Sequence, residues 1–222
     1  MICARVLTTA AACAVLGLTA CGGGGNDAQA PSTVVTQILS DSSLDGDIEQ
    51  TSPNSFTITQ GMSATVQTVL AGIDPVSLTE FRAFLNFPLT GPQGVPANAI
   101  IDSAFLEVFL DDLQPVNASL PILIDLIAFQ PPTLIATDFD RTVQPALAST
   151  TISPPISRSD VGTYVSIDVT SLMVQAQRSG LPDFQVRIME DLGPAISALM
   201  TIDDTTGANR STRAPLLTVT YR

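Results

Sequence analysis

Three side chains that carry much of protein chemistry are missing from this sequence. It has no histidine and no tryptophan, and its nine basic residues are all arginine, so it has no lysine either. The chain therefore cannot build a Ser-His-Asp or Cys-His nucleophile, a Ser-Lys dyad, a Schiff base or a Walker-type phosphate lysine. Zinc sites of the usual histidine and cysteine kind are excluded too. What remains is carboxylate chemistry and the binding of hard cations by oxygen ligands.

The three cysteines lie at positions 3, 13 and 21, close to the N-terminus. From Val6 to Ala20 the chain is uncharged and mostly apolar, which is typical of a signal peptide and too short for a membrane-spanning helix of about 20 residues. The stretch ends in Leu18-Thr19-Ala20-Cys21, which resembles the lipobox of bacterial lipoproteins. The resemblance implies that residues 1–20 are removed and that Cys21 is lipidated. The alternative is an ordinary secretory signal with a chance cysteine.

A glycine-rich segment follows the lipobox and continues to Ser32. Such a segment cannot bury an apolar face, so we interpret residues 21–32 as the lipidated cysteine and a flexible tether. In lipoproteins of Gram-negative bacteria, an aspartate directly after the cysteine favours retention in the inner membrane. Gly22 occupies that position here. By this resemblance we expect an exported protein that is anchored by lipid in the cell outer membrane.

The chain is strongly acidic, with a formal net charge of −12 at pH 7. Removal of Arg5 with the signal peptide makes the mature part more negative still. A field of this sign repels nucleic acid and anionic lipid headgroups, and we expect no nucleic-acid partner. It also makes uronic-acid polymers unfavourable partners unless a cation intervenes. Solubility alone is the alternative explanation of the charge.

Residues 33–222 fit one all-β domain, because short segments of strand composition recur between glycine, proline, asparagine and aspartate. The predicted strands are Val34–Leu39, Ser55–Thr59, Thr65–Leu70, Phe81–Phe87, Ile100–Leu110, Pro121–Phe129, Thr163–Asp168, Phe184–Met189, Ala198–Ile202 and Leu216–Tyr221. Gln144–Asp160 is predicted as a loop with a short strand near Thr150. One short helix is predicted at Ser171–Ser179, ended by Gly180. About ten strands with one helix favour a β-sandwich of jelly-roll type.

Four segments, taken in order, resemble the strands and corners of DNRLRE-type domains. They are Glu80–Phe87, Ala97–Val108, the corner Ile167-Asp168-Val169-Thr170 and the closing strand Ala214–Tyr221. The resemblance covers roughly Ser40 to Arg222. It implies a jelly-roll sandwich of the kind found on secreted and surface proteins, with relatives among carbohydrate-binding modules. The family often has a tryptophan in the helix after the corner, where this chain has Val174–Gln177, and this departure weakens the transfer of sugar binding.

Aromatic side chains are the first candidates for a ligand site, because sugar rings stack their C–H faces on aromatic rings. The chain offers two tyrosines and nine phenylalanines. Phe81, Phe87 and Phe184 fall in strand patterns that place them in the core. The side chains to examine for a ligand platform are Phe105, Phe109, Phe139 and Tyr164.

Acidic residues are densest between Asp41 and Glu49. Oxygens of Asp41, Asp45, Asp47 and Glu49 around the Gly46 turn could hold calcium, the one cofactor that the sequence suggests. The alternative is a plain Asp/Gly turn that leads into a strand. Two further groups, Asp138–Arg141 and Asp203-Asp204, are interpreted as solvated loop charges.

Asp168 and Thr170 are predicted to be structural, because a carboxylate at a strand-to-helix corner can accept backbone amides. Taken together, these features predict a non-catalytic lipoprotein of the cell envelope, acting as a binding or structural module with carbohydrate as one ligand class. A module for protein–protein adhesion or surface assembly is the alternative. A carboxylate-based glycan hydrolase or lyase is a remoter one, since it needs two facing acids in a cleft.

Overall fold

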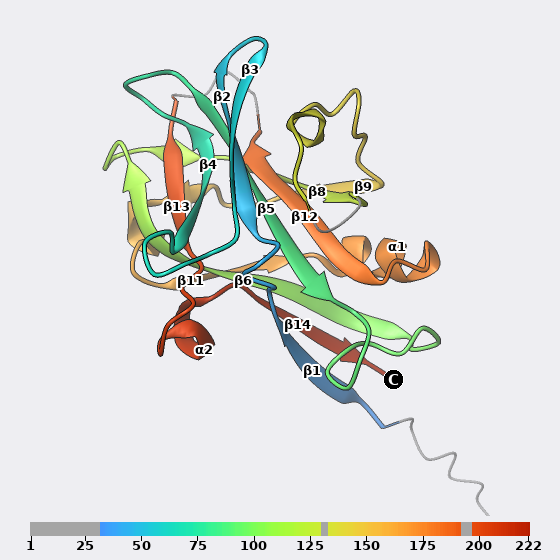
Figure 1. Cartoon of the computed structure of the whole chain (residues 1–222). Helices are drawn as coiled ribbons and strands as arrows, with labels where there is room; N and C mark the ends of the chain where they lie inside the picture. Colours follow the sequence, from blue (N-terminus) through green and yellow to red (C-terminus); the bar gives the residue numbers. More distant parts are fainter. Residues whose placement is uncertain (1–31, 130–132, 192–196) are drawn as a thin grey trace, which may run out of the picture. The chain divides into compact units, whose positions relative to one another are not determined.

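The computed structural model describes residues 32–129, 133–191 and 197–222, and these fold mostly as antiparallel β-strands (Figure 1). The predicted signal peptide, Cys21 and the tether as far as Pro31 lie outside the described residues. Ser32–Arg222 make up one compact unit. Among the described residues, no helix is long and apolar enough to cross a membrane.

The strands and helices have the following bounds. The strands are β1 (Val34–Leu39), β2 (Gly46–Ser52), β3 (Ser55–Gln60), β4 (Thr68–Ile73), β5 (Glu80–Pro88), β6 (Ile101–Gln114), β7 (Ser119–Leu120), β8 (Ile122–Ile127), β9 (Ala148–Thr151), β10 (Ile156–Ser157), β11 (Tyr164–Asp168), β12 (Asp183–Glu190), β13 (Leu199–Asp203) and β14 (Leu216–Tyr221). The helical segments are α1 (Thr170–Arg178), α2 (Arg210–Arg213) and the 3-10 turns η1 (Ala136–Asp138) and η2 (Arg158–Asp160).

The long strand β6 organises the sheet. Its first half pairs with β14 and β11, and its second half pairs with β13. Beyond β14 the sheet continues to β1, and beyond β13 it continues through β4, β5, β12 and β8 to β9. The hairpin of β2 and β3 attaches to β5. Figure 1 shows the sheet curling so that β5 and β12 cross over β6, β14 and β1, which gives the two layers of a sandwich.

The main core lies between these layers. In β6, Ala104, Leu106, Val108 and Leu110 are buried, while the intervening side chains point outward, so the predicted two-residue period is confirmed. The inner residues of β5 and β12, and Leu172, Met173 and Ala176 of α1, complete this core. Removal of apolar surface from water is the main force that holds the layers together.

A second, smaller core lies on the other side of β5. It contains Ile48, Phe84, Ile127, Phe129, Leu134 and Phe139. The last three belong to the loop between β8 and β9, which folds back over β5 and β12 and carries η1. As a result, β5 is buried on both faces, and charged residues on its second face are enclosed.

The predicted all-β sandwich with one short helix is confirmed. Two predicted strands, Val34–Leu39 and Leu216–Tyr221, have the same bounds in the structure. The described residues contain fourteen strands rather than about ten. The most important strand missing from the prediction is β2. It was missed because its acidic residues indicated a turn. Helix α1 begins one residue before the predicted start.

Candidate functional site

Three of the four predicted ligand residues share one surface of the sandwich, the outward face of β6 and β11. Phe105 and Phe109 alternate with the buried residues of β6 and therefore point away from the core. Tyr164 is the register partner of Phe109, and their ring centroids are 5.5 Å apart. Phe105 and Tyr164 have exposed fractions of 38% and 39%. Four residues along a strand separate Phe105 from Phe109 by about 13 Å.

A hollow of about 670 Å³ lies beside Phe105. The start of α1 and the end of β11 form one side, and Thr150–Ser153 at the end of β9 form the other. Its lining combines an aromatic ring, one carboxylate and several hydroxyl groups; it consists of Phe105, Thr150, Thr151, Ile152, Ser153, Ser166, Ile167, Asp168, Thr170 and Ser171. The volume falls in the range of small-molecule sites. We refer to this hollow as the Phe105 groove.

Asp168 and Thr170 hold the corner of the Phe105 groove. Oδ1 of Asp168 accepts the backbone N–H of Thr170 at 2.9 Å, and Oγ1 of Thr170 accepts the backbone N–H of Ala104 at 2.9 Å. The hydrogen bonds from Thr170 lower the pKa of Asp168, so the carboxylate is ionised at neutral pH. Asp168 is also exposed and lines the groove, which adds a possible contact with a ligand to the structural role predicted from the sequence.

The other end of the face is closed by an arginine that the sequence analysis did not single out. The Arg213 guanidinium carbon lies 4.8 Å from the centroid of the Phe109 ring, a cation–π distance. Arg213 also pairs with Asp203 at 3.3 Å and with Asp111 at 3.6 Å. It follows β13 at the end of α2, far in sequence from Phe109, and no local pattern could have revealed the contact. The adjacent hydroxyl residues Thr150 and Thr151, in β9, were a usable signal for the groove.

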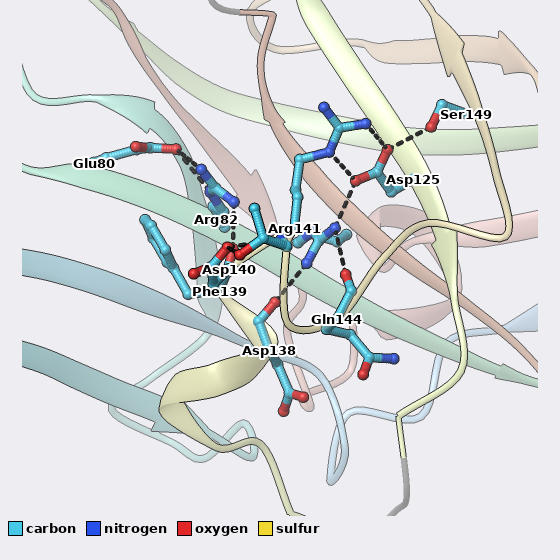
Figure 2. Close-up of polar contacts among 11 residues, drawn as sticks. Glu80, Arg82, Asp125, Asp138, Phe139, Asp140, Arg141, Gln144 and Ser149 are labelled. Atoms are coloured by element: carbon cyan, nitrogen blue, oxygen red, sulfur yellow. Dashed lines mark hydrogen bonds and ion pairs between the residues drawn. The ribbon is translucent and has the colours of Figure 1, made fainter.

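The prediction that Phe139 belongs to an exposed ligand platform is wrong. Its exposed fraction is 4%, and the guanidinium of Arg82 lies 4.0 Å from its ring centroid. Figure 2 shows Phe139, a residue of the loop between β8 and β9, beside Arg82, which also pairs with Glu80 at 2.7 Å. The second apolar core encloses this ring because the loop folds back over β5.

Asp125 and Arg187 form the centre of the same network. Both side chains are fully buried, and Nη2 of Arg187 donates to Oδ2 of Asp125 at 2.7 Å. Arg141 and Ser149 also donate to Asp125 (Figure 2). Burial alone would raise the pKa of Asp125, but hydrogen bonds from Ser149 and Arg187 and the charge of Arg187 lower it. The network is closed within the protein, and we interpret it as structural rather than as a ligand site.

Three of the four predicted calcium ligands, Asp41, Asp45 and Asp47, have separate hydrogen-bond partners. Asp41 accepts the backbone N–H and the hydroxyl of Ser43, and Asp47 accepts the backbone N–H of Leu70. Glu49 is half-buried on β2. Among the described residues, no group of three or more acidic side chains is placed to hold a metal ion.

Asp45 is fully buried and meets Asp204 instead. Its Oδ1 accepts the backbone N–H of Asn86 at 2.7 Å, and the charge of Asp204 lies close enough to act on its carboxyl group. Arg210 donates to Oδ1 of Asp204 at 2.9 Å. Burial and the nearby charge of Asp204 raise the pKa of Asp45 well above its usual value. The interpretation of Asp203 and Asp204 as solvated is wrong, since both are buried; Asp138 of the other loop group is buried as well.

A second hollow, of about 540 Å³, lies between the loop that joins β5 to β6, the end of α1 and Tyr221. Gln177 holds this loop by donating to the carbonyl oxygens of Pro96 and Ala99. The lining contains no charged side chain. None of the ligand residues predicted from the sequence lies in it.

Comparison with known proteins adds no assignment, because no family model matches the chain and no curated protein is significantly similar to it.

Proposed function

We propose that this protein is a non-catalytic carbohydrate-binding module of the cell envelope, and that the Phe105 groove with the adjoining Phe109–Tyr164 pair is its binding face. The observation that carries the proposal is the half-exposed Phe105 ring at the wall of a groove lined by one carboxylate and several hydroxyl groups. Sugars present apolar C–H faces to rings and hydroxyl groups to polar atoms, so this combination of groups suits them.

The groove also bears on the choice between binding and catalysis. Hydrolysis of a glycosidic bond by two carboxyl groups needs both to face the bond, about 5–10 Å apart. Asp168 is the only carboxylate in the lining of the groove. This favours a binding module over a hydrolase or lyase.

Replacement of Phe105 by alanine tests the binding face. We expect Phe105→Ala to weaken binding of the best ligand on a glycan array by at least about tenfold, equal to about 1.4 kcal/mol, because the stacking surface is lost. Ile135→Ala is the matched control, since Ile135 is an exposed apolar residue in the loop between β8 and β9, away from the groove. Equal affinities for the two variants and the wild type would place the glycan elsewhere.

A protein partner is the second candidate, and strand β1 favours it. Among the described residues β1 pairs with β14 alone, so it forms an edge of the sheet. The strand carries no charge, and Val35 has an exposed fraction of 61%. An uncharged edge strand can accept a strand from another chain. A silent glycan array, together with self-association that Val35→Lys abolishes, would favour this candidate over carbohydrate.

We propose in addition that Cys21 carries the lipid anchor. Cys21→Ser removes the thiol that lipidation requires, so the variant should leave the membrane fraction and lose label from radioactive palmitate. Cys13→Ser is the matched control, because Cys13 lies within the predicted signal peptide, and it should keep both properties. Membrane association and labelling of Cys21→Ser would contradict the lipobox interpretation.

A further inference from the structure

The Phe105 groove is lined by a single charge, and that charge is negative. Asp168 is the single ionisable side chain in the lining, and no arginine is among the lining residues. The chain has no lysine or histidine, and its formal net charge is −12. The arginine at the other end of this face, Arg213, lies over Phe109 and is already paired with Asp203 and Asp111. A ligand with carboxylate or sulfate groups would therefore enter the groove without a compensating positive charge and against a negative field.

Asp168 is also placed to meet a cation. It is the register partner of Phe105 across β6 and β11, so the carboxylate and the ring stand side by side on the outward face. The carboxylate is exposed, and Thr170 is its hydrogen-bond partner among the described residues. An ammonium group gains both from a carboxylate acceptor and from the face of an aromatic ring.

We propose that the Phe105 groove selects glycans that carry a free amine, with the sugar ring against Phe105 and its ammonium group on the carboxylate of Asp168. The inference rests on the proposed carbohydrate-binding function and adds the ligand class. Side-chain hydroxyl groups around the ring can hydrogen bond to the hydroxyl groups of the sugar; they belong to Thr150, Ser153, Ser166 and Ser171. Neutral glycans stack on the same ring without the charged contact, and uronates are rejected.

Three oligosaccharides of equal length and the same β-1,4 linkage test the proposal, because they differ only at the second carbon. The probes are chitosan hexamers with an ammonium group, chitin hexamers with an acetamide and cellulose hexamers with a hydroxyl. Calorimetry at low salt should give the chitosan hexamer about tenfold tighter binding than the cellulose hexamer, since a hydrogen bond between ions is stronger than a neutral one. The advantage should shrink as salt rises.

Asp168→Asn isolates the charge, because the amide oxygen can still accept the N–H of Thr170 and hold the corner. This variant should lose most of the preference for the chitosan hexamer over the cellulose hexamer, because the ionic contact with the ammonium group is gone. A thermal melt of the variant checks that the corner is intact. Asp160→Asn is the matched control: this aspartate of η2 accepts hydrogen bonds from Ser157 and lies outside the groove, so chitosan selectivity should persist.

Each outcome has a distinct meaning. Equal affinity for the three hexamers, or selectivity that survives Asp168→Asn, overturns the amine-selective groove and leaves the proposed function standing. If none of the hexamers binds, and a glycan array is silent as well, the proposed function itself fails. Tighter binding of an alginate hexamer than of the chitosan hexamer would reverse the assigned charge preference.

Discussion

Arg187→Met is expected to lower the free energy of unfolding by about 3–5 kcal/mol, because it removes one half of a buried ion pair. In the wild type, the guanidinium donates to Asp125 at 2.7 Å and to the carbonyl oxygens of Asp138 at 2.6 Å and Gln144 at 3.2 Å. The variant leaves all three acceptors, two of which belong to the loop between β8 and β9, with fewer donors. Methionine fills much of the volume, so the loss reports on charge and hydrogen bonding rather than on a cavity.

Urea unfolding measures this loss of free energy, and two further variants serve as comparisons. Arg158→Met removes the partner of Asp112 from a pair that is 3.2 Å long and exposed, and we expect it to cost less than about 1 kcal/mol. The double variant Arg187→Met with Asp125→Leu should recover part of the loss, because the buried carboxylate that lost Arg187 as its partner is removed as well. A cost below about 1 kcal/mol for Arg187→Met alone would show that the network does not hold the loop.

The protein is expected to lose stability as the pH rises from 3.8 to about 7, and Asp47 is one measurable source of this loss. Burial raises the pKa of Asp47 from its usual 3.8 to about 7. The folded protein therefore holds a proton that the unfolded chain has already released. The stability from this proton is fully present below pH 3.8 and is lost progressively as the pH rises to about 7. A shift of this size corresponds to a loss on the order of 4 kcal/mol.

Asp47→Asn should remove this dependence, because its amide is neutral at every pH and its oxygen can still accept the backbone N–H of Leu70. Above about pH 8 the variant should be more stable than the wild type. Asp74→Asn is the control: hydrogen bonds from Val76 and Ser77 lower the pKa of this carboxyl group, so its own contribution to the slope lies below pH 3.8. Its removal should leave the slope above that pH unchanged. A slope that persists in Asp47→Asn would assign the proton elsewhere, first of all to Asp45, whose pKa is raised in the same direction.

Thermal unfolding in the presence of calcium tests the calcium hypothesis. Calcium binding near Asp45 and Asp47 needs ionised carboxylates. At pH 8, where Asp47 is mostly ionised, the midpoint of thermal unfolding should therefore rise with calcium concentration if the site exists. The chain has no histidine, the side chain that usually titrates near neutral pH. A change in stability near pH 7 therefore cannot come from histidine.

Local patterns in the sequence determined the strands and the outward position of the aromatic face. Because successive side chains of a strand point to opposite faces, the alternation in β6 predicted that Phe105 and Phe109 share a face opposite to Ala104 and Leu106. The absence of histidine and lysine likewise excluded whole classes of catalysis without any structure. These conclusions depend on neighbours in sequence or on composition alone, and they needed no knowledge of distant contacts.

The tertiary structure alone decided which polar and aromatic residues are enclosed. Phe139 and Asp138 have the local sequence of an exposed loop, yet both are buried because their loop folds back over β5. Asp45 meets Asp204, and Phe109 meets Arg213, across more than 100 residues of chain. The Phe105 groove likewise forms where β6, β9, β11 and α1 come together. Burial and charge pairing depend on which strands become neighbours in the sheet, and the spacing of residues within one strand carries no record of that choice.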